Sequence, residues 1–123
     1  MPLQQRLVVA GLSAIQAQAA QGTVQNGLTS AGTTQGNAFP LPADVNRFTT
    51  VGAGSGTILP PMNPGDEIEI INGQVTNALL VYPPVGGQIN QLGTNAAYSI
   101  AVATPSCFVQ CITPLIYVAQ QSA

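Results

Sequence analysis

The pattern of hydrophobic and polar residues changes character near residue 38. Before it, apolar residues recur every three to five positions, at Leu3, Leu7, Leu12, Ile15 and Ala19. That spacing is typical of one face of a helix. After it, short apolar or β-branched runs alternate with turn residues about every ten positions, which is typical of β-structure. The pattern therefore predicts an N-terminal arm over residues 1–37 and a β-domain over residues 38–123.

Eight runs in the predicted β-domain have the composition of strands. They are Ala38–Leu41, Asn46–Val51, Thr57–Leu59, Glu67–Ile71, Ala78–Tyr82, Tyr98–Ala103, Phe108–Ile112 and Ile116–Ala119. The segments between them are rich in Gly, Pro, Asn and Asp, which supply the positive or fixed φ angles that chain reversals need. Eight short strands favour an all-β fold, arranged as a jelly roll, β-sandwich or β-barrel. A chain of 123 residues is long enough for one such core.

The predicted arm divides into two halves. The helical period runs from about Leu3 to Gln21, although Gly11 weakens a helix there by roughly 1 kcal/mol relative to alanine. The same stretch has the charge and apolar run of a secretory signal, but Gly11 and Ser13 interrupt that run and argue against a signal. Residues 22–37 show no clear period, so they are predicted to be extended or irregular.

Two predicted strands are apolar on both faces. The opposing sets are Leu79 with Val81 against Leu80 with Tyr82, and Val109 with Cys111 against Phe108 with Ile112. Because side chains alternate along a strand, only one face can enter the domain's own core. The other face needs a second cover, either the N-terminal segment or a neighbouring subunit.

Charge is scarce throughout the chain. Six of 123 side chains are charged, and lysine and histidine are absent, whereas about a quarter of residues are charged in ordinary domains. Two arginines cannot form the basic surface that nucleic-acid binding requires. No stretch approaches the roughly 18 apolar residues of a membrane span. The scarcity predicts a surface that is weakly repelled from copies of itself and therefore suited to an assembly.

The same scarcity removes most catalytic chemistry. Without histidine or lysine, serine and cysteine nucleophiles lack their usual base. Glu67 and Glu69 share one face of a predicted strand; a solvated face is the preferred interpretation, with a calcium site and paired acid-base catalysis as weaker alternatives. No catalytic residue, cofactor or metal ligand is assigned. An enzyme is therefore the least favoured class.

Cys107 and Cys111 lie four residues apart in a predicted strand. At ~3.3 Å per residue they are separated by about 13 Å, beyond the reach of a disulfide between them. Both point to the same side as Val109, which predicts small buried hydrophobes. The thiols are predicted to be free, or bonded between chains.

Three residues near turns are candidates for contact with a partner. Asp44 and Arg47 flank the start of a strand and are predicted to form an ion pair with a structural or interfacial role. Tyr82 precedes two prolines, where it either terminates a strand or stacks on a sugar. The complete predicted assembly interface comprises Leu3, Leu7, Leu12, Ile15, Val24, Leu28, Asp44, Arg47 and Tyr82.

Five segments between about residues 29 and 112 form a distinctive combination. They are Asn46–Val51, Ile58–Pro60, Pro64–Ile68, Asn77–Pro84 and Gly87–Asn90. Together they resemble small β-rich virion proteins of tailed bacteriophages. The resemblance implies a non-enzymatic structural component of the virion, foremost a capsid cement or decoration protein on the capsid surface, made in the host cytoplasm.

The partners expected for such a protein are the major capsid protein and further copies of the chain, as a dimer or trimer. Neither a nucleic acid nor a membrane is expected as a partner. The alternative function is a phage fibre or tail-tip module that binds a host glycan near Tyr82 and Tyr98. A secreted adhesin-like protein is a third hypothesis.

Overall fold

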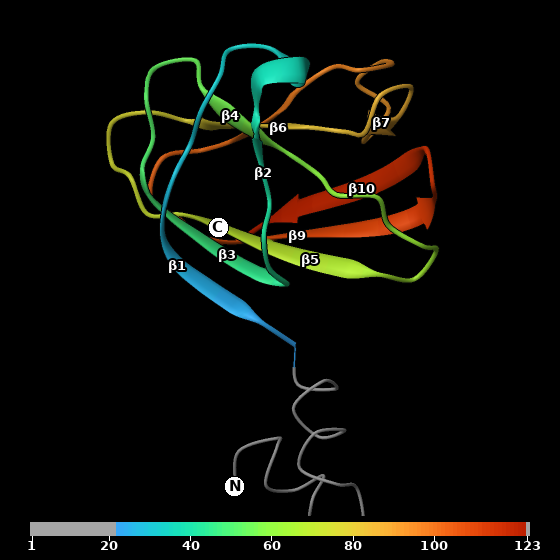
Figure 1. Cartoon of the computed structure of the whole chain (residues 1–123), viewed down its shortest axis with the longest axis horizontal. Helices are drawn as coiled ribbons and strands as arrows, with labels where there is room; N and C mark the ends of the chain where they lie inside the picture. Colours follow the sequence, from blue (N-terminus) through green and yellow to red (C-terminus); the bar gives the residue numbers. More distant parts are fainter. Residues whose placement is uncertain (1–21, 123) are drawn as a thin grey trace, which may run out of the picture.

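The computed structural model describes residues 22–122, and the predicted helix from Leu3 to Gln21 lies outside them. Within the described residues the chain is all-β, with ten strands in two sheets (Figure 1). The elements are β1 (Val24–Thr29), the short 3-10 helix η1 (Gln35–Asn37), β2 (Phe39–Pro40), β3 (Val45–Thr50), β4 (Gly56–Ile58), β5 (Glu67–Asn72), β6 (Leu79–Tyr82), β7 (Gln88–Ile89), β8 (Tyr98–Ile100), β9 (Thr104–Thr113) and β10 (Ile116–Gln121). No helix in this range is long and apolar enough to cross a membrane.

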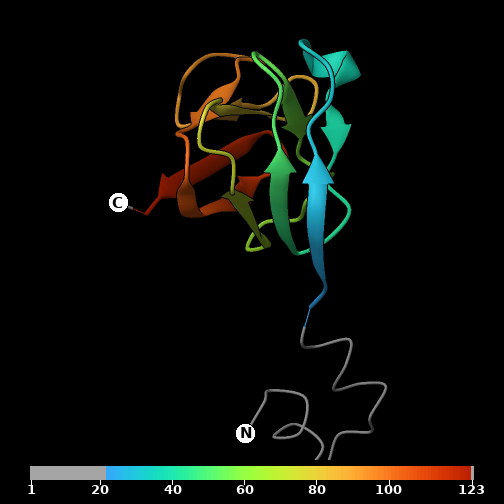
Figure 2. The same ribbon diagram turned by 90° about the vertical axis from the view of Figure 1, so that its left-hand side faces the viewer.

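The chain crosses from one sheet to the other between successive strands from β1 to β9. One sheet has the order β1-β3-β5-β9-β10-β7 and the other the order β2-β4-β6-β8. The pairs β1-β3, β3-β5, β2-β4 and β4-β6 are all parallel; Figure 2 shows β1 and β3 running side by side in the same direction. The first six strands thus form three turns of a short β-solenoid, while β8, β9 and β10 add antiparallel strands.

The predicted all-β class is confirmed, but the predicted jelly roll or barrel is wrong. A jelly roll is built from antiparallel strands, whereas the first turns of this chain pair in parallel. Hydrophobic alternation shows where a strand lies and which face is apolar. It carries no information about which strand is its neighbour, so the solenoid winding could not be predicted from it.

The structure contains two strands that the sequence pattern did not indicate. In β1 only Leu28 is buried, so the strand has no apolar alternation, and β7 is two residues long. Because β1 pairs with β3, the folded unit already includes residues 24–29. The β-unit therefore begins before the predicted boundary at residue 38, and residues 24–37 are part of it rather than part of an arm.

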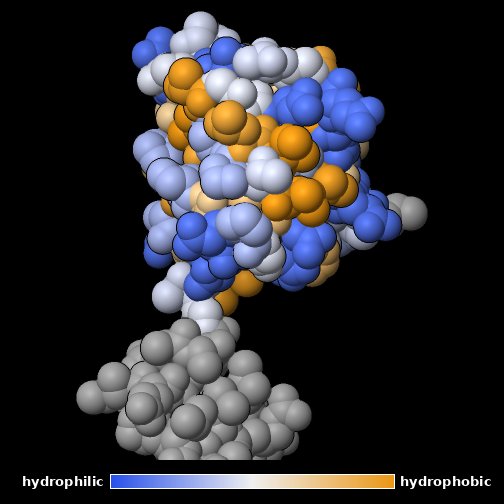
Figure 3. Space-filling model, turned by 90° about the vertical axis from the view of Figure 1, so that its right-hand side faces the viewer, coloured by the Kyte–Doolittle hydropathy of each residue, from blue (hydrophilic) through white to orange (hydrophobic). Residues whose placement is uncertain are grey.

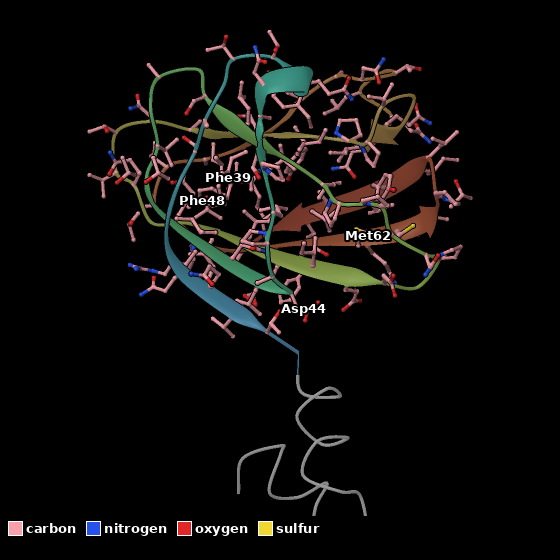
Figure 4. All side chains as sticks on the ribbon, in the orientation of Figure 1. Phe39, Asp44, Phe48 and Met62 are labelled. Atoms are coloured by element: carbon pink, nitrogen blue, oxygen red, sulfur yellow. The ribbon has the colours of Figure 1, made fainter. Side chains whose placement is uncertain are left out.

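The hydrophobic core lies between the two sheets. Its fully buried apolar side chains include Phe48, Val51, Ile70, Leu79, Val81, Ile89, Ile100, Cys107, Val109, Cys111 and Tyr117. Phe39 of β2 packs edge to face on Phe48 of β3, with ring centroids 6.0 Å apart (Figure 4). Since β2 and β3 belong to different sheets, this contact joins the two layers, and such pairs contribute about 0.5–1.5 kcal/mol beyond burial.

Two fully buried asparagines hold the segments where the chain leaves a sheet. Asn46 accepts a hydrogen bond from the amide of Ala43 at 3.1 Å and donates to its carbonyl at 2.7 Å. The Asn72 amide nitrogen donates to the carbonyls of Asn77 and Ala101 at 3.1 and 3.2 Å, and its oxygen accepts from Gln74 N–H at 3.0 Å. These side chains satisfy backbone groups that crossings between sheets would otherwise leave unpaired.

Replacement of Asn72 by alanine is expected to lower the free energy of unfolding by roughly 1–3 kcal/mol, because buried backbone groups lose their partner. Urea unfolding followed by circular dichroism measures the change. The control is Asn63→Ala, an exposed position whose backbone N–H still donates to Asp66. Equal stability of the two variants would contradict the role given to Asn72.

Gly56 is required by the close approach of β4 to β6. A Cβ atom at this position would lie 2.5 Å from the carbonyl oxygen of Leu80, with which Gly56 is paired. The backbone of one strand would have to shift. We expect Gly56→Ala to cost about 1–3 kcal/mol of stability, measured as a lower midpoint of thermal unfolding.

The matched control for this prediction is Gly36→Ala. A Cβ on Gly36 meets nothing within 4 Å, so the substitution is expected to leave the midpoint nearly unchanged. If Gly56→Ala is as stable as Gly36→Ala, the two strands do not approach as closely as described.

Candidate functional site

The members of the predicted interface that lie within residues 22–122 do not form one site. Leu3, Leu7, Leu12 and Ile15 lie outside the described residues. Val24 is 71 % exposed on the edge strand β1, whereas Leu28 is 8 % exposed and belongs to the core. Leu28 is therefore not available to a partner while the domain is folded.

Asp44 and Arg47 have different partners, so the predicted ion pair is wrong. The Asp44 carboxylate accepts hydrogen bonds from the amide and hydroxyl of Thr23, at 2.8 and 3.2 Å. Arg47 donates to the Oδ1 atom of Asn26 at 3.0 Å. Both residues thus hold the segment Thr23 to Asn26, which contains the start of β1, against β3 and the residue before it. This is a structural role.

Tyr82 is buried, and its hydroxyl donates to the carbonyl of Thr33 at 3.1 Å. Leu80, on the same outer side of β6, is half-buried and lies against Gly56. The second face of β6 is therefore covered by the chain itself. Because Tyr82 is covered, its ring is not presented for stacking on a sugar.

A hollow of ≈ 360 Å³ lies beside the first turn of the solenoid. Three of the four carboxylates of the chain, those of Asp44, Asp66 and Glu67, line it together with Leu41, Met62 and three prolines; Figure 4 labels Asp44 and Met62. Asp66 accepts from the amide of Asn63 at 2.9 Å. Among residues 22–122, no three or more His, Cys, Asp or Glu side chains are grouped so as to hold a metal ion. Two of the three carboxylates that line the hollow, those of Asp44 and Asp66, accept hydrogen bonds from backbone amides of the chain itself.

Glu67 and Glu69 both lie on the outer face of β5. Glu67 is exposed, and the half-buried Glu69 accepts a hydrogen bond from the hydroxyl of Ser106 at 2.9 Å. Their registered neighbours on β9 are Gln110 and Phe108. The cross-strand neighbours of both carboxylates are thus uncharged side chains, and Glu69 is tied to the chain itself through Ser106.

The two cysteines are buried free thiols that share the inner face of β9 with Val109, as predicted. Burial raises the pKa of the Cys107 thiol to about 11, although a hydrogen bond with the backbone of Gln120 opposes the shift. Burial also raises the pKa of Tyr117 to about 12, and the neighbouring Cys111 adds to it. A bond between chains through either cysteine would require the core to open.

The outer side of the β9-β10 ribbon is the clearest unexplained surface. We call the outward residues Phe108, Gln110, Ile112, Ile116, Val118 and Gln120 the β9-β10 face. Its four apolar members are 40–51 % exposed, and Leu115 in the connecting turn is 51 % exposed. Figure 3 views the molecule from the side of that turn and shows a band of hydrophobic residues across it.

The β9-β10 face was only partly visible in the sequence. The two-sided apolar pattern indicated Phe108 and Ile112 as an extra face. Ile116 and Val118 lie within a predicted strand, but from the sequence they were not assigned to an exposed apolar face. The signal that could have found them is their alternation with the buried Tyr117 and Ala119. No protein-family model, curated protein or solved structure matches the chain.

The raised pKa values of Cys107 and Tyr117 predict a loss of stability in alkali. Both groups deprotonate more easily in the unfolded chain, so their contribution is fully present below pH 9 and is lost as the pH rises from about 9 to about 12. We expect a fall on the order of 2 kcal/mol from Cys107 by pH 11, and a smaller fall from Tyr117, whose pKa of about 12 in the folded chain lies above that range. Urea unfolding under reducing conditions, at intervals from pH 7 to 11, measures it.

The control for the alkaline prediction is Cys107→Ala. This variant is expected to be less stable at neutral pH, because it leaves a cavity, but to lose less stability between pH 9 and 11. A free energy of unfolding that stays constant up to pH 11 in the unmodified chain would show that the two groups are not buried as described.

Proposed function

We propose that the protein is a non-enzymatic structural component of a tailed-phage virion, a capsid decoration or cement protein. The single observation that carries the proposal is the character of the described surface. Residues 22–122 contain five charged side chains, those of Asp44, Arg47, Asp66, Glu67 and Glu69. Four of these side chains form hydrogen bonds, and all the partners are residues of the chain's own turns and strands. Such a surface favours contact with other proteins over chemistry.

The resemblance of the five segments to phage virion proteins points this contact towards a capsid. The proposed mechanism is mechanical: the β-unit lies over a junction between capsid subunits and residues 1–21 reach along a neighbour. Fully extended, that segment spans up to ~70 Å. It joins the β-unit at β1, which is the edge strand of the larger sheet. Because binding requires the assembled shell, it stabilises the shell by mass action.

The test uses shells of the phage that encodes the chain, prepared without it. The full chain is expected to sediment with the shells and to raise the temperature at which they dissociate. A full-length variant with Leu3, Leu7, Leu12 and Ile15 all changed to Gln is expected to bind at least tenfold more weakly, a loss of ~1.4 kcal/mol.

A chain that begins at residue 22 provides the control for folding, because it retains β1 and the buried Leu28. It is expected to unfold in a single cooperative thermal transition, as a folded β-unit does. If the full chain does not sediment with the shells, the proposed function is wrong. If the shortened chain binds as well as the full chain, the capsid contact lies on the β-unit instead of residues 1–21.

A further inference from the structure

The outer surface of the six-stranded sheet is divided into a charged half and an uncharged half. Arg47, Glu67 and Glu69 point outward from β3 and β5. The β9-β10 face beside them carries four apolar side chains and two glutamines, with no charge. Across the ribbon, Phe108 is paired with Gln120 and Gln110 with Val118, so apolar and amide groups alternate over the face.

The size of the β9-β10 face is that of an interface centre. With ~150–250 Å² per large side chain, the exposed fractions of its apolar members and Leu115 leave roughly 400 Å² of apolar surface. A stable protein interface covers about 800 Å² on each partner, of which a little over half is apolar. The apolar area of the β9-β10 face, which is bordered by Gln and Glu, is therefore about what each partner of a stable interface contributes.

We propose that the β9-β10 face binds the same face of a second copy of this chain, forming a two-fold dimer. In such a dimer each residue meets a residue of the identical surface, so the surface must be complementary to itself. An uncharged face meets this condition because two copies bring no like charges together. Gln110 and Gln120 fit it as well, since an amide both donates and accepts hydrogen bonds.

The position of the carboxylates selects the symmetry axis. Glu67 and Glu69 border the face on the β5 side, next to Gln110 and Phe108, while the β7 side offers Gln88. An axis parallel to the strands places the β5 side of one copy over the β7 side of the other. The carboxylates of the two copies are then kept apart, and Ile112 of one copy faces Ile116 of the other. Aligned packing of two sheets has this geometry.

The contrast between β6 and β9 supports a partner for this face in particular. Both strands are apolar on two sides, and on β6 the second side is covered by the segment containing Thr33. On β9 the second side remains about half exposed at Phe108 and Ile112. The inference does not depend on the capsid role, because it concerns the free protein in solution.

Sedimentation velocity of the full chain tests the proposal at concentrations from about 1 to about 200 μM, a range that spans typical micromolar dissociation constants. The expected result is a species of twice the 12.5 kDa chain mass. Val118→Lys is expected to weaken the dimer roughly 100-fold or more, because two desolvated lysines enter the interface. Phe108→Gln, a milder change that adds no charge, is expected to weaken it about tenfold.

The matched control is Thr49→Lys, which adds the same charge at an exposed position of β3 in the same sheet. It is expected to leave the dimer intact. Circular dichroism and urea unfolding establish that each variant is folded before its mass is interpreted. A chain that stays monomeric over the whole range overturns the proposal. A dimer that persists in both Val118→Lys and Phe108→Gln, or that Thr49→Lys disrupts equally, also overturns it.

Discussion

Parallel pairing between successive turns of the chain is the constraint on which the rest of the structure depends. Once β1, β3 and β5 are in register, Leu28, Phe48 and Asn72 occupy matching positions. A shift of one residue would turn every inward side chain outward. Because the other sheet is wound by the same turns, both sheets are aligned together, and Phe39 meets Phe48 between them.

This winding explains why polar residues lie at the centre of a protein with so few charged side chains. A chain that crosses repeatedly between two layers brings backbone groups into regions where water does not reach them. Asn46 and Asn72 bind those groups, and no buried side-chain nitrogen or oxygen among the described residues is left without a partner. Gly56 solves a steric problem of the same kind, since two strands of different turns approach there too closely for a side chain.

The few charged side chains have different roles in different parts of the molecule. Asp44 and Arg47 bind Thr23 and Asn26, so they hold the first strand rather than a partner. Glu67 and Glu69 border an apolar face without entering it. A protein with so few charges has little to oppose contact between copies. The capsid contact proposed for residues 1–21 and the dimer contact proposed for the β9-β10 face use separate parts of the chain.

The sequence by itself determined the fold class, the place of eight strands and the inner face of β9, because these follow from local alternation of side chains along the backbone. It could not reveal β1, whose single buried residue leaves no pattern, or the parallel order of the strands, which depends on contacts between distant residues. Tyr82 and Phe108 show the same limit. Both lie on the second face of a strand that is apolar on two sides. Only the tertiary structure decided that the segment containing Thr33 covers Tyr82, while Phe108 stays about half exposed. The physical reason is that the residues covering a strand face come from far away in the sequence.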